Sequence, residues 1–290
     1  MTTPFPLSRD VLALSTRRSY IELNARARAT ALLDAGTFHE LLGPFDHIES
    51  PWLPMQGIVP QSDDGCVVAK GKIDGQPAVV IAMEGKFQGG SIGEVCGMKM
   101  AEAFRLARID NEKGIPTRAV LSLESGGVRL QEANMGELVI AEIYAEMAAL
   151  RKYIPLIVVI AGPTGCFGGM SLAAGLATYV VMTREARLSM NGPEVIEQEA
   201  GVAEFRAADK PFVWSVNGGA QRFATGFADV LVEDDVTEIV DAVKGLFRQG
   251  QPARLRTDKY ELFIKRLSAM DPSRQWTGED IRKAWKEIAE

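Results

Sequence analysis

The chain has 290 residues, with 32 Lys and Arg against 38 Asp and Glu, which gives a net charge of −6. This length fits one large α/β domain or two small domains, and 47% hydrophobic with 24% charged residues excludes wholesale disorder. The acidic balance argues against general nucleic-acid binding. Cys66, Cys96 and Cys166 lie too far apart in sequence for a structural zinc site, so we expect no metal and three buried thiols.

The first third of the chain predicts a helix, a loop and a β-hairpin. The helix is expected over residues 17–34 and ends at Gly36, and the Pro- and Gly-rich residues 43–61 are expected to form a loop. Residues 66–72 and 77–83 predict two strands joined at Asp74-Gly75, because Asp-Gly tolerates a positive φ. A helix over residues 93–110 follows.

The middle of the chain repeats one pattern, in which an apolar strand ends in a glycine turn and a helix follows. Strand 118–123 is followed by a turn at 124–127 and a helix over 132–152. Strand 155–161 is followed by a turn at 162–169 and a short helix over 170–177. Strands that alternate with helices predict an α/β fold with mainly parallel strands.

The last third predicts strands over 179–182, 188–190 and 229–232, and helices over 237–248, 258–269 and 278–289. We therefore divide the chain into a helical N-terminal extension over 1–55, a core over 56–236 and C-terminal helices over 237–290. The chain shows neither the apolar region of a signal peptide nor an apolar segment long enough to span a bilayer. We expect a cytoplasmic protein with no membrane partner.

Glycine pairs are the main functional clue. They occur at Gly89-Gly90, Gly126-Gly127, Gly168-Gly169 and Gly218-Gly219. A dinucleotide fingerprint requires two glycines separated by one residue, and this spacing is absent from the sequence. A P-loop requires a Lys after its glycines, and Met170 stands there instead.

A nucleophilic serine is a second interpretation of these turns. Ser171 lies in a sequence close to the nucleophile elbow, and Ser125 follows another strand. Hydrolases of the elbow type have their histidine after the serine, whereas His39 and His47 precede both serines. A Ser–Lys dyad stays open. The simpler expectation for Ser171 is a hydroxyl satisfied within the first turn of a helix.

An oxyanion hole is the third interpretation. Backbone N–H groups at a helix N-terminus are unpaired, and glycine lets a carbonyl oxygen approach them closely. Turns at adjacent strand ends can present two such groups to one oxygen, without His, Cys or metal. We favour this role for the second and third pairs and a structural turn for Gly89-Gly90. Valine at Gly127 or Gly168 is expected to fold and to block the site.

Five segments in order resemble one family. Residues 125–132 (SGGVRLQE) resemble the SGGxRxQE segment of the acyl-CoA half of biotin-dependent carboxyltransferases, and residues 162–169 (GPTGCFGG) resemble their second glycine motif. Residues 191–195, 217–220 and 227–235 continue the match in the family's order. The resemblance covers residues 55–236 and implies the crotonase fold, an α/β spiral of ββα units, here with added terminal helices.

The details are most similar to β subunits of biotin-independent malonate decarboxylases. The resemblance implies a malonyl thioester carried on the phosphopantetheine-type arm of an acyl carrier protein, and decarboxylation to an acetyl thioester through an enolate. It implies a second crotonase-type γ subunit in a hetero-oligomer, and no cofactor bound to this chain. It places Gly126, Gly127, Gly168 and Gly169 in the oxyanion hole and the following residues at the substrate: Ser125, Val128, Arg129, Gly165 and Phe167.

Other roles for this chain and for its charged residues stay open. Arg129 can pair with the helix that follows it, hold the turn or bind an anionic group. An acidic carrier protein needs a local basic patch, which Lys86, Lys99, Arg105 and Arg108 could supply. The alternatives for the whole chain are a biotin-dependent carboxyltransferase subunit, a Ser–Lys peptidase and a noncatalytic scaffold subunit.

Overall fold

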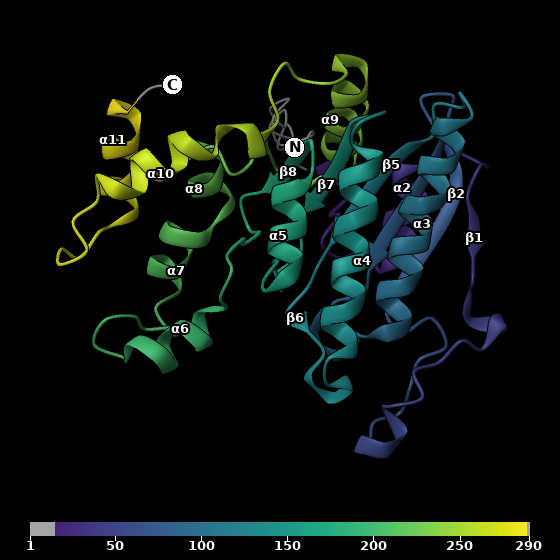
Figure 1. Ribbon diagram of the computed structural model, residues 1–290, viewed down its shortest axis with the longest axis horizontal. Coiled ribbons are helices and arrows are strands. Elements are labelled where there is room, and N and C mark those ends of the chain that lie inside the picture. Colours follow the sequence, from purple (N-terminus) through teal and green to yellow (C-terminus); the bar gives the residue numbers. More distant parts are fainter. Residues whose placement is uncertain (1–14, 289–290) are drawn as a thin grey trace, which may run out of the picture.

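The computed structural model describes residues 15–288, and its centre is a seven-stranded sheet (Figure 1). The strand order is β1-β2-β3-β5-β7-β8-β9. The pairs β1–β2 and β2–β3 are antiparallel, and every later pair is parallel. The strands are β1 (His39–Leu41), β2 (Cys66–Ile73), β3 (Gln76–Met83), β5 (Arg118–Leu123), β7 (Leu156–Ile160), β8 (Tyr179–Thr183) and β9 (Val230–Val232).

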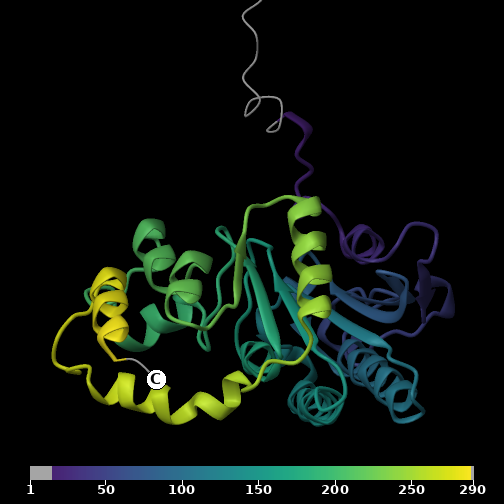
Figure 2. The same cartoon turned by 90° about the horizontal axis from the view of Figure 1, so that it is seen from above.

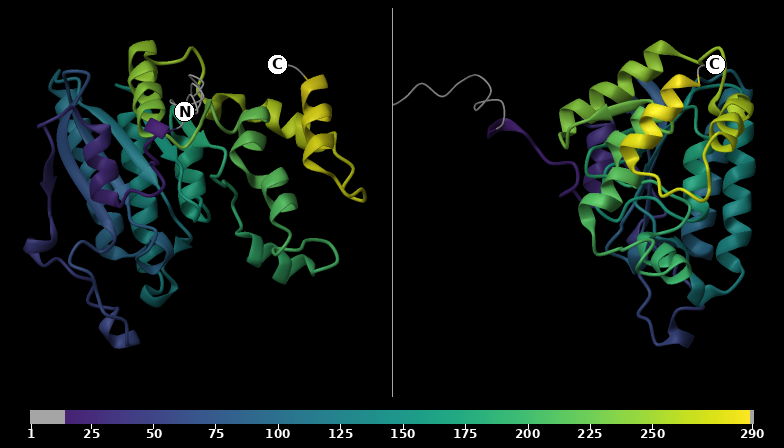
Figure 3. Two further views of the ribbon diagram at one scale, coloured as in Figure 1. Left: turned by 180° about the vertical axis from the view of Figure 1, so that it is seen from behind. Right: turned by 90° about the vertical axis from the view of Figure 1, so that its left-hand side faces the viewer.

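Helices cover both faces of this sheet. One face carries α3 (Glu94–Glu112), α4 (Met135–Leu150) and α5 (Gly169–Leu176), and the other carries α2 (Ala25–Leu32) and α9 (Val236–Gln249). Figure 2 shows the two helical layers with the sheet between them, and Figure 3 shows α2 and α9 from behind. Alternate residues of each strand enter the two cores, because successive side chains of a strand point to opposite faces.

A second, two-stranded parallel sheet joins β4 (Ser91–Ile92) to β6 (Gly127–Val128). It lies beyond the carboxyl ends of β3 and β5, because each of its strands follows one of the loops that leave those ends. Strands of two residues have no hydrophobic period, so the sequence could not predict them. This small sheet holds Gly127 at the candidate site.

The last two described helices form a lobe beside the sheet, together with three helices from the segment that follows β8, whereas the predicted C-terminal helix over 237–248 packs on the sheet as α9 (Figures 1 and 3). An aromatic cluster joins them, with the ring centroid of Phe227 4.9 Å from Phe263 and 5.8 Å from Trp285. The lobe consists of α6 (Pro193–Ala200), α7 (Lys210–Asn217), α8 (Gly219–Ala224), α10 (Tyr260–Ser268) and α11 (Gly278–Glu287).

The hairpin, the parallel strands and most of the helices lie where the sequence predicts them. The three cysteines are free and buried, which confirms their predicted role as core residues. Gly219 is a packing point, since a Cβ there would lie 1.9 Å from Thr183 O. Among the helices of residues 15–288, none has the length and apolarity needed to cross a bilayer.

The first predicted helix is too long at its start. It begins at Ala25, because Asn24 caps it by accepting the Ala27 N–H at 2.9 Å. The backbone before Ala25 makes other hydrogen bonds. The carboxylate of Asp234 accepts the Tyr20 and Ile21 N–H groups. The segment predicted as a helical extension also contributes β1 to the sheet.

Residues 188–190 do not form the predicted strand. Leu188 makes only an isolated bridge to Cys166, while Arg187 bridges to Gly218. This segment therefore borders the second glycine turn without extending the sheet. Helices α6 and α7 are absent from the sequence prediction. For α7 a signal was present, because Asp209 caps this helix by accepting the Phe212 N–H at 3.1 Å.

Candidate active site at the paired glycine turns

The turns that follow β5 and β7 lie against each other. Ser125 N–H donates to Gly165 O at 2.8 Å, and Phe167 N–H donates to Ser125 O at 2.9 Å. These bonds continue the pairing of β5 with β7 beyond the end of the sheet. Adjacent parallel strands thus bring the two predicted glycine motifs together.

Gly127 and Gly168 meet where the turns touch. Their φ angles are +115° and +58°, a region in which side chains are strained. A Cβ on Gly168 would lie 3.0 Å from Gly127 Cα. Valine at either position therefore distorts the turns themselves, which corrects the expectation that it would only block an intact site.

Two of the four predicted N–H groups are already bonded to backbone. Gly126 N–H donates to Gly89 O at 2.9 Å, and Gly168 N–H donates to Met190 O at 2.8 Å. Because Gly89 O accepts the Gly126 N–H, the first glycine pair, Gly89-Gly90, has the structural role expected of it. The predicted oxyanion hole would therefore use the N–H groups of the other two glycines, Gly127 and Gly169.

These two N–H groups are better placed to serve a ligand. Gly127 N–H donates to a side chain, Ser125 Oγ, at 3.2 Å, which is the long end of the usual N–H···O range. Gly169 is the first residue of α5, so its N–H has no carbonyl partner within the helix. The helix dipole adds partial positive charge at the same point.

Tyr144 fixes the start of α5 from the neighbouring helix α4. Its hydroxyl donates to Gly169 O, and burial raises its pKa to about 12, so the hydroxyl stays protonated at neutral pH. A Cβ on Gly169 would lie 2.9 Å from Ile140 Cδ1. Close packing therefore sets the position of the Gly169 N–H.

Both candidate serines support the turns with their hydroxyls. Ser125 is fully buried and accepts the Gly127 N–H. Ser171 Oγ donates to Gly168 O at 2.7 Å and lies 3.7 Å from Met190 Sδ. The expectation of a satisfied hydroxyl at Ser171 is confirmed.

Arg129 is enclosed below the first turn. Its guanidinium pairs with Asp64 at 2.7 Å and with Glu132 at 3.0 Å, and the three side chains are 0% exposed. Burial raises the pKa of Asp64, and the positive charge of Arg129 offsets part of this rise. The backbone N–H of Arg129 donates to Ile92 O at 2.9 Å, so Arg129 holds the turn in place. Because its guanidinium is buried between two carboxylates, a substrate cannot reach it in this conformation.

The remaining predicted substrate residues frame the turns. Gly165 has a φ of +80°, and a Cβ there would lie 2.9 Å from Arg187 O. Phe167 is buried, with the Arg187 guanidinium 5.3 Å from its ring centroid. Val128 is half-buried in β6.

Sequence reasoning missed an apolar groove of about 690 Å³ beside the second turn. It lies between α5 and α10, and its lining includes Tyr144 and Ser171. Leu172, Met190 and Tyr260 also line it and are 51%, 54% and 63% exposed. The only sequence signal was the run of apolar residues in α10, which comes from a distant part of the chain.

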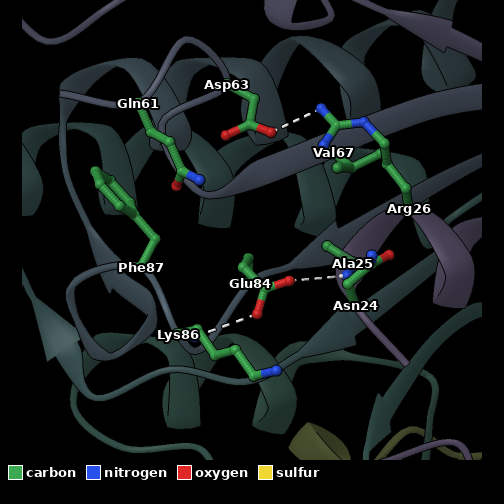
Figure 4. Close-up of a pocket in the computed structure, with 9 residues that line it drawn as sticks. All are labelled: Asn24, Ala25, Arg26, Gln61, Asp63, Val67, Glu84, Lys86 and Phe87. Carbon is green, nitrogen blue, oxygen red and sulfur yellow. Dashed lines mark hydrogen bonds and ion pairs between the residues drawn. The ribbon is translucent and has the colours of Figure 1, made fainter. Parts of the chain in front are cut away.

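A smaller, polar pocket of about 330 Å³ lies beside the N-terminus of α2 (Figure 4). Within it, Arg26 pairs with Asp63 at 2.7 Å, and Glu84 accepts the Ala25 N–H at 3.1 Å. Lys86 also lines this pocket.

The other members of the proposed basic patch do not join Lys86. Lys99 is buried and its ammonium donates to the Asp63 and Cys66 carbonyls. Arg105 and Arg108 are paired with acidic side chains. Among residues 15–288, no group of three or more His, Cys, Asp or Glu side chains is arranged to hold a metal ion.

Comparison with known proteins identifies the family. The carboxyl transferase domain model matches residues 21–289. The malonyl-S-ACP:biotin-protein carboxyltransferase of Malonomonas rubra is 38% identical over 265 residues, covering 88% of this chain and 81% of that protein.

Solved structures agree with this result. A chain of a Pseudomonas malonate decarboxylase hetero-tetramer in complex with malonate is 57% identical, with a TM-score of 0.92, covering 95% of this chain and 100% of that chain. A transcarboxylase 12S structure matches with a TM-score of 0.65 and 28% identity, covering 77% of this chain and 41% of that chain. The crotonase-like α/β fold predicted from the motifs is confirmed, and the chain belongs to the carboxyl transferase domain family.

Proposed function

We propose that this chain is the β-type subunit of a decarboxylase that converts malonyl thioester into acetyl thioester and CO₂. The observation that carries the proposal is the pair of touching glycine turns, in which Gly127 lies against Gly168 and Gly169 begins α5. The similarity to chains of malonate decarboxylase structures from Pseudomonas supports the choice of substrate.

The chemistry follows from where the negative charge goes. The bond between the α-carbon and the carboxylate breaks, CO₂ leaves, and the electron pair forms an enolate whose charge lies on the thioester oxygen. Each backbone N–H that binds this oxygen stabilises the transition state by about 3–4 kcal/mol. A proton then reaches the α-carbon and gives the acetyl thioester. Exclusion of water from the carboxylate also favours loss of CO₂.

The thioester is proposed to arrive on the phosphopantetheine-type arm of an acyl carrier protein, with no cofactor bound to this chain. A second, crotonase-type γ subunit completes the site. Related structures are a malonate decarboxylase hetero-tetramer and an MdcD-MdcE hetero-dimer, both from Pseudomonas. Exposed apolar side chains beside the second turn support a partner there, because such surfaces are usually covered. The same proposal places the protein in the cytoplasm.

Independence from biotin is part of the proposal, and transfer of the carboxyl group to a biotin protein is the second candidate. The Malonomonas rubra relative favours this candidate, because its name describes that transfer. In both reactions the malonyl thioester leaves the same enolate, so the glycine turns act alike.

The test measures CO₂ release from malonyl-acyl carrier protein by the chain purified with its copurifying subunits, with and without avidin. Turnover that avidin does not change supports biotin-independent decarboxylation. CO₂ release that avidin abolishes supports the biotin-dependent candidate, in which the carboxyl group passes to biotin and then leaves the carboxybiotin as CO₂. Absence of malonyl-dependent CO₂ release under both conditions contradicts the proposed function.

A further inference from the structure

We infer that Glu124, paired with Arg28, is a positioning residue that holds the two glycine turns in register, an inference that rests on the proposed function. Glu124 follows β5 directly and precedes Ser125 in the first turn. Its side chain turns back into the protein and is only 7% exposed. It therefore lies beneath the turns as part of their support.

Two glycines leave room for its carboxylate. A Cβ on Gly85 would lie 2.5 Å from Glu124 Cδ, and a Cβ on Gly162 would lie 2.3 Å from the same atom. Gly85 follows β3 and Gly162 follows β7, so the carboxylate lies between the neighbouring strand ends. Thr164 N lies 3.5 Å from Glu124 Oε1, at the start of the second turn.

The backbone at this residue is equally enclosed. A Cβ on Gly90 would lie 1.9 Å from Glu124 O, so the loop after β3 presses directly on the first turn. The same loop accepts the Gly126 N–H through Gly89 O. Three strand-end loops thus meet at residue 124, and a change there reaches both turns.

Arg28 of α2 compensates the buried charge. Its Nη1 lies 2.5 Å from Glu124 Oε2, and its Nη2 donates to Ile21 O at 2.8 Å. The Arg28 side chain is 5% exposed. An uncompensated carboxylate here would repel the enolate charge formed at the adjacent turn. The pair therefore fixes the turns without adding net negative charge beside the oxyanion.

The test compares two identical substitutions in the purified complex. Glu124→Gln keeps the shape of the side chain and removes the ion pair. Glu146→Gln is the matched control, because Glu146 of α4 pairs with Arg108 of α3 at 2.7 Å, away from the turns. We expect Glu124→Gln to lower kcat for CO₂ release by at least ~10-fold while KM changes by less than ~3-fold. The control should keep both constants within ~2-fold.

A rescue experiment tests the specific contact. Gly162→Ala adds a Cβ that presses on the Glu124 carboxylate, so it should also lower kcat. Glu124→Asp in the same chain shortens the side chain by one methylene and frees that space. The double variant should therefore exceed Gly162→Ala alone in kcat.

Hydrogen exchange gives a readout that does not depend on the reaction. Backbone amides in peptides covering 124–130 and 162–170 should exchange faster in Glu124→Gln and unchanged in Glu146→Gln. Unchanged exchange together with unchanged kcat overturns the inference, and so does faster exchange spread evenly over the chain. If the wild-type complex releases no CO₂ but the two peptides respond, the proposed function fails and the positioning role stands.

Discussion

Gly168→Ala is the substitution that best separates an effect on catalysis at the glycine turns from an effect on the stability of the fold. Gly168 has a φ of +58° and a ψ of −144°, a region that essentially only glycine adopts, so a side chain there costs about 1–3 kcal/mol. The added Cβ would also lie 3.0 Å from Gly127 Cα, closer than the ~3.5–4.0 Å at which carbon atoms pack. The two turns must separate by several tenths of an ångström to accept it.

This separation sets the expected effect on the rate. Moving the N–H groups of Gly127 and Gly169 apart weakens the hydrogen bonds that both are proposed to donate to one oxygen. Loss of one oxyanion donor lowers kcat by about 10²–10³-fold, which is the upper bound for this variant. A partial displacement predicts a fall of about 10-fold or more in CO₂ release from malonyl-acyl carrier protein.

Gly114→Ala is the control, because it also places a side chain at a positive φ, but away from the two turns. Gly114 has a φ of +81°, and a Cβ there meets nothing within 4 Å. Both variants should lose free energy of unfolding, measured in denaturant, but only Gly168→Ala should lose activity. Equal kcat values for the two variants would refute the reasoning about the turns.

Three further substitutions test the support of the site and of the fold. Tyr144→Phe removes the bond to Gly169 O and should lower kcat about 3- to 10-fold with little effect on the melting temperature, and a wild-type kcat would contradict this role. Arg129→Met leaves the carboxylates of Asp64 and Glu132 buried without their partner, so it should reduce the free energy of unfolding by about 3–5 kcal/mol in denaturant titration. Gly245→Ala in α9 meets open space and should raise the free energy of unfolding by about 0.5–1 kcal/mol, and a decrease would show that this helix position is under strain.

The strand–turn–helix repeat was enough to predict the α/β fold and the meeting of the two glycine motifs. Parallel strands end at the same edge, so turns that follow neighbouring strands lie together. The residues next to Gly126 and Gly168 in the sequence could not show that the N–H groups of these two glycines already donate to backbone carbonyls. The acceptors are Gly89 O and Met190 O, which only the folded chain brings close.

Charged residues show the same limit. Lys99 lies on a helix and looks like a surface residue in the sequence, but its ammonium reaches two buried carbonyls. Arg129 stands in a motif that suggests contact with substrate, yet Asp64 encloses it from a loop before β2. In both cases a distant segment of chain decides the role, and local patterns carry no signal of it.

The central claim is that the paired turns stabilise a thioester enolate, and exchange at the α-carbon tests it most directly. The proposed reaction ends when a proton reaches that carbon, so its reverse forms the same enolate from the acetyl thioester. In D₂O, the wild-type complex should exchange the α-protons of acetyl-acyl carrier protein for deuterium, and Gly168→Ala should do so more slowly by the factor seen in CO₂ release. Catalysed CO₂ release without any such exchange, or exchange that Gly168→Ala leaves unchanged, would contradict the account.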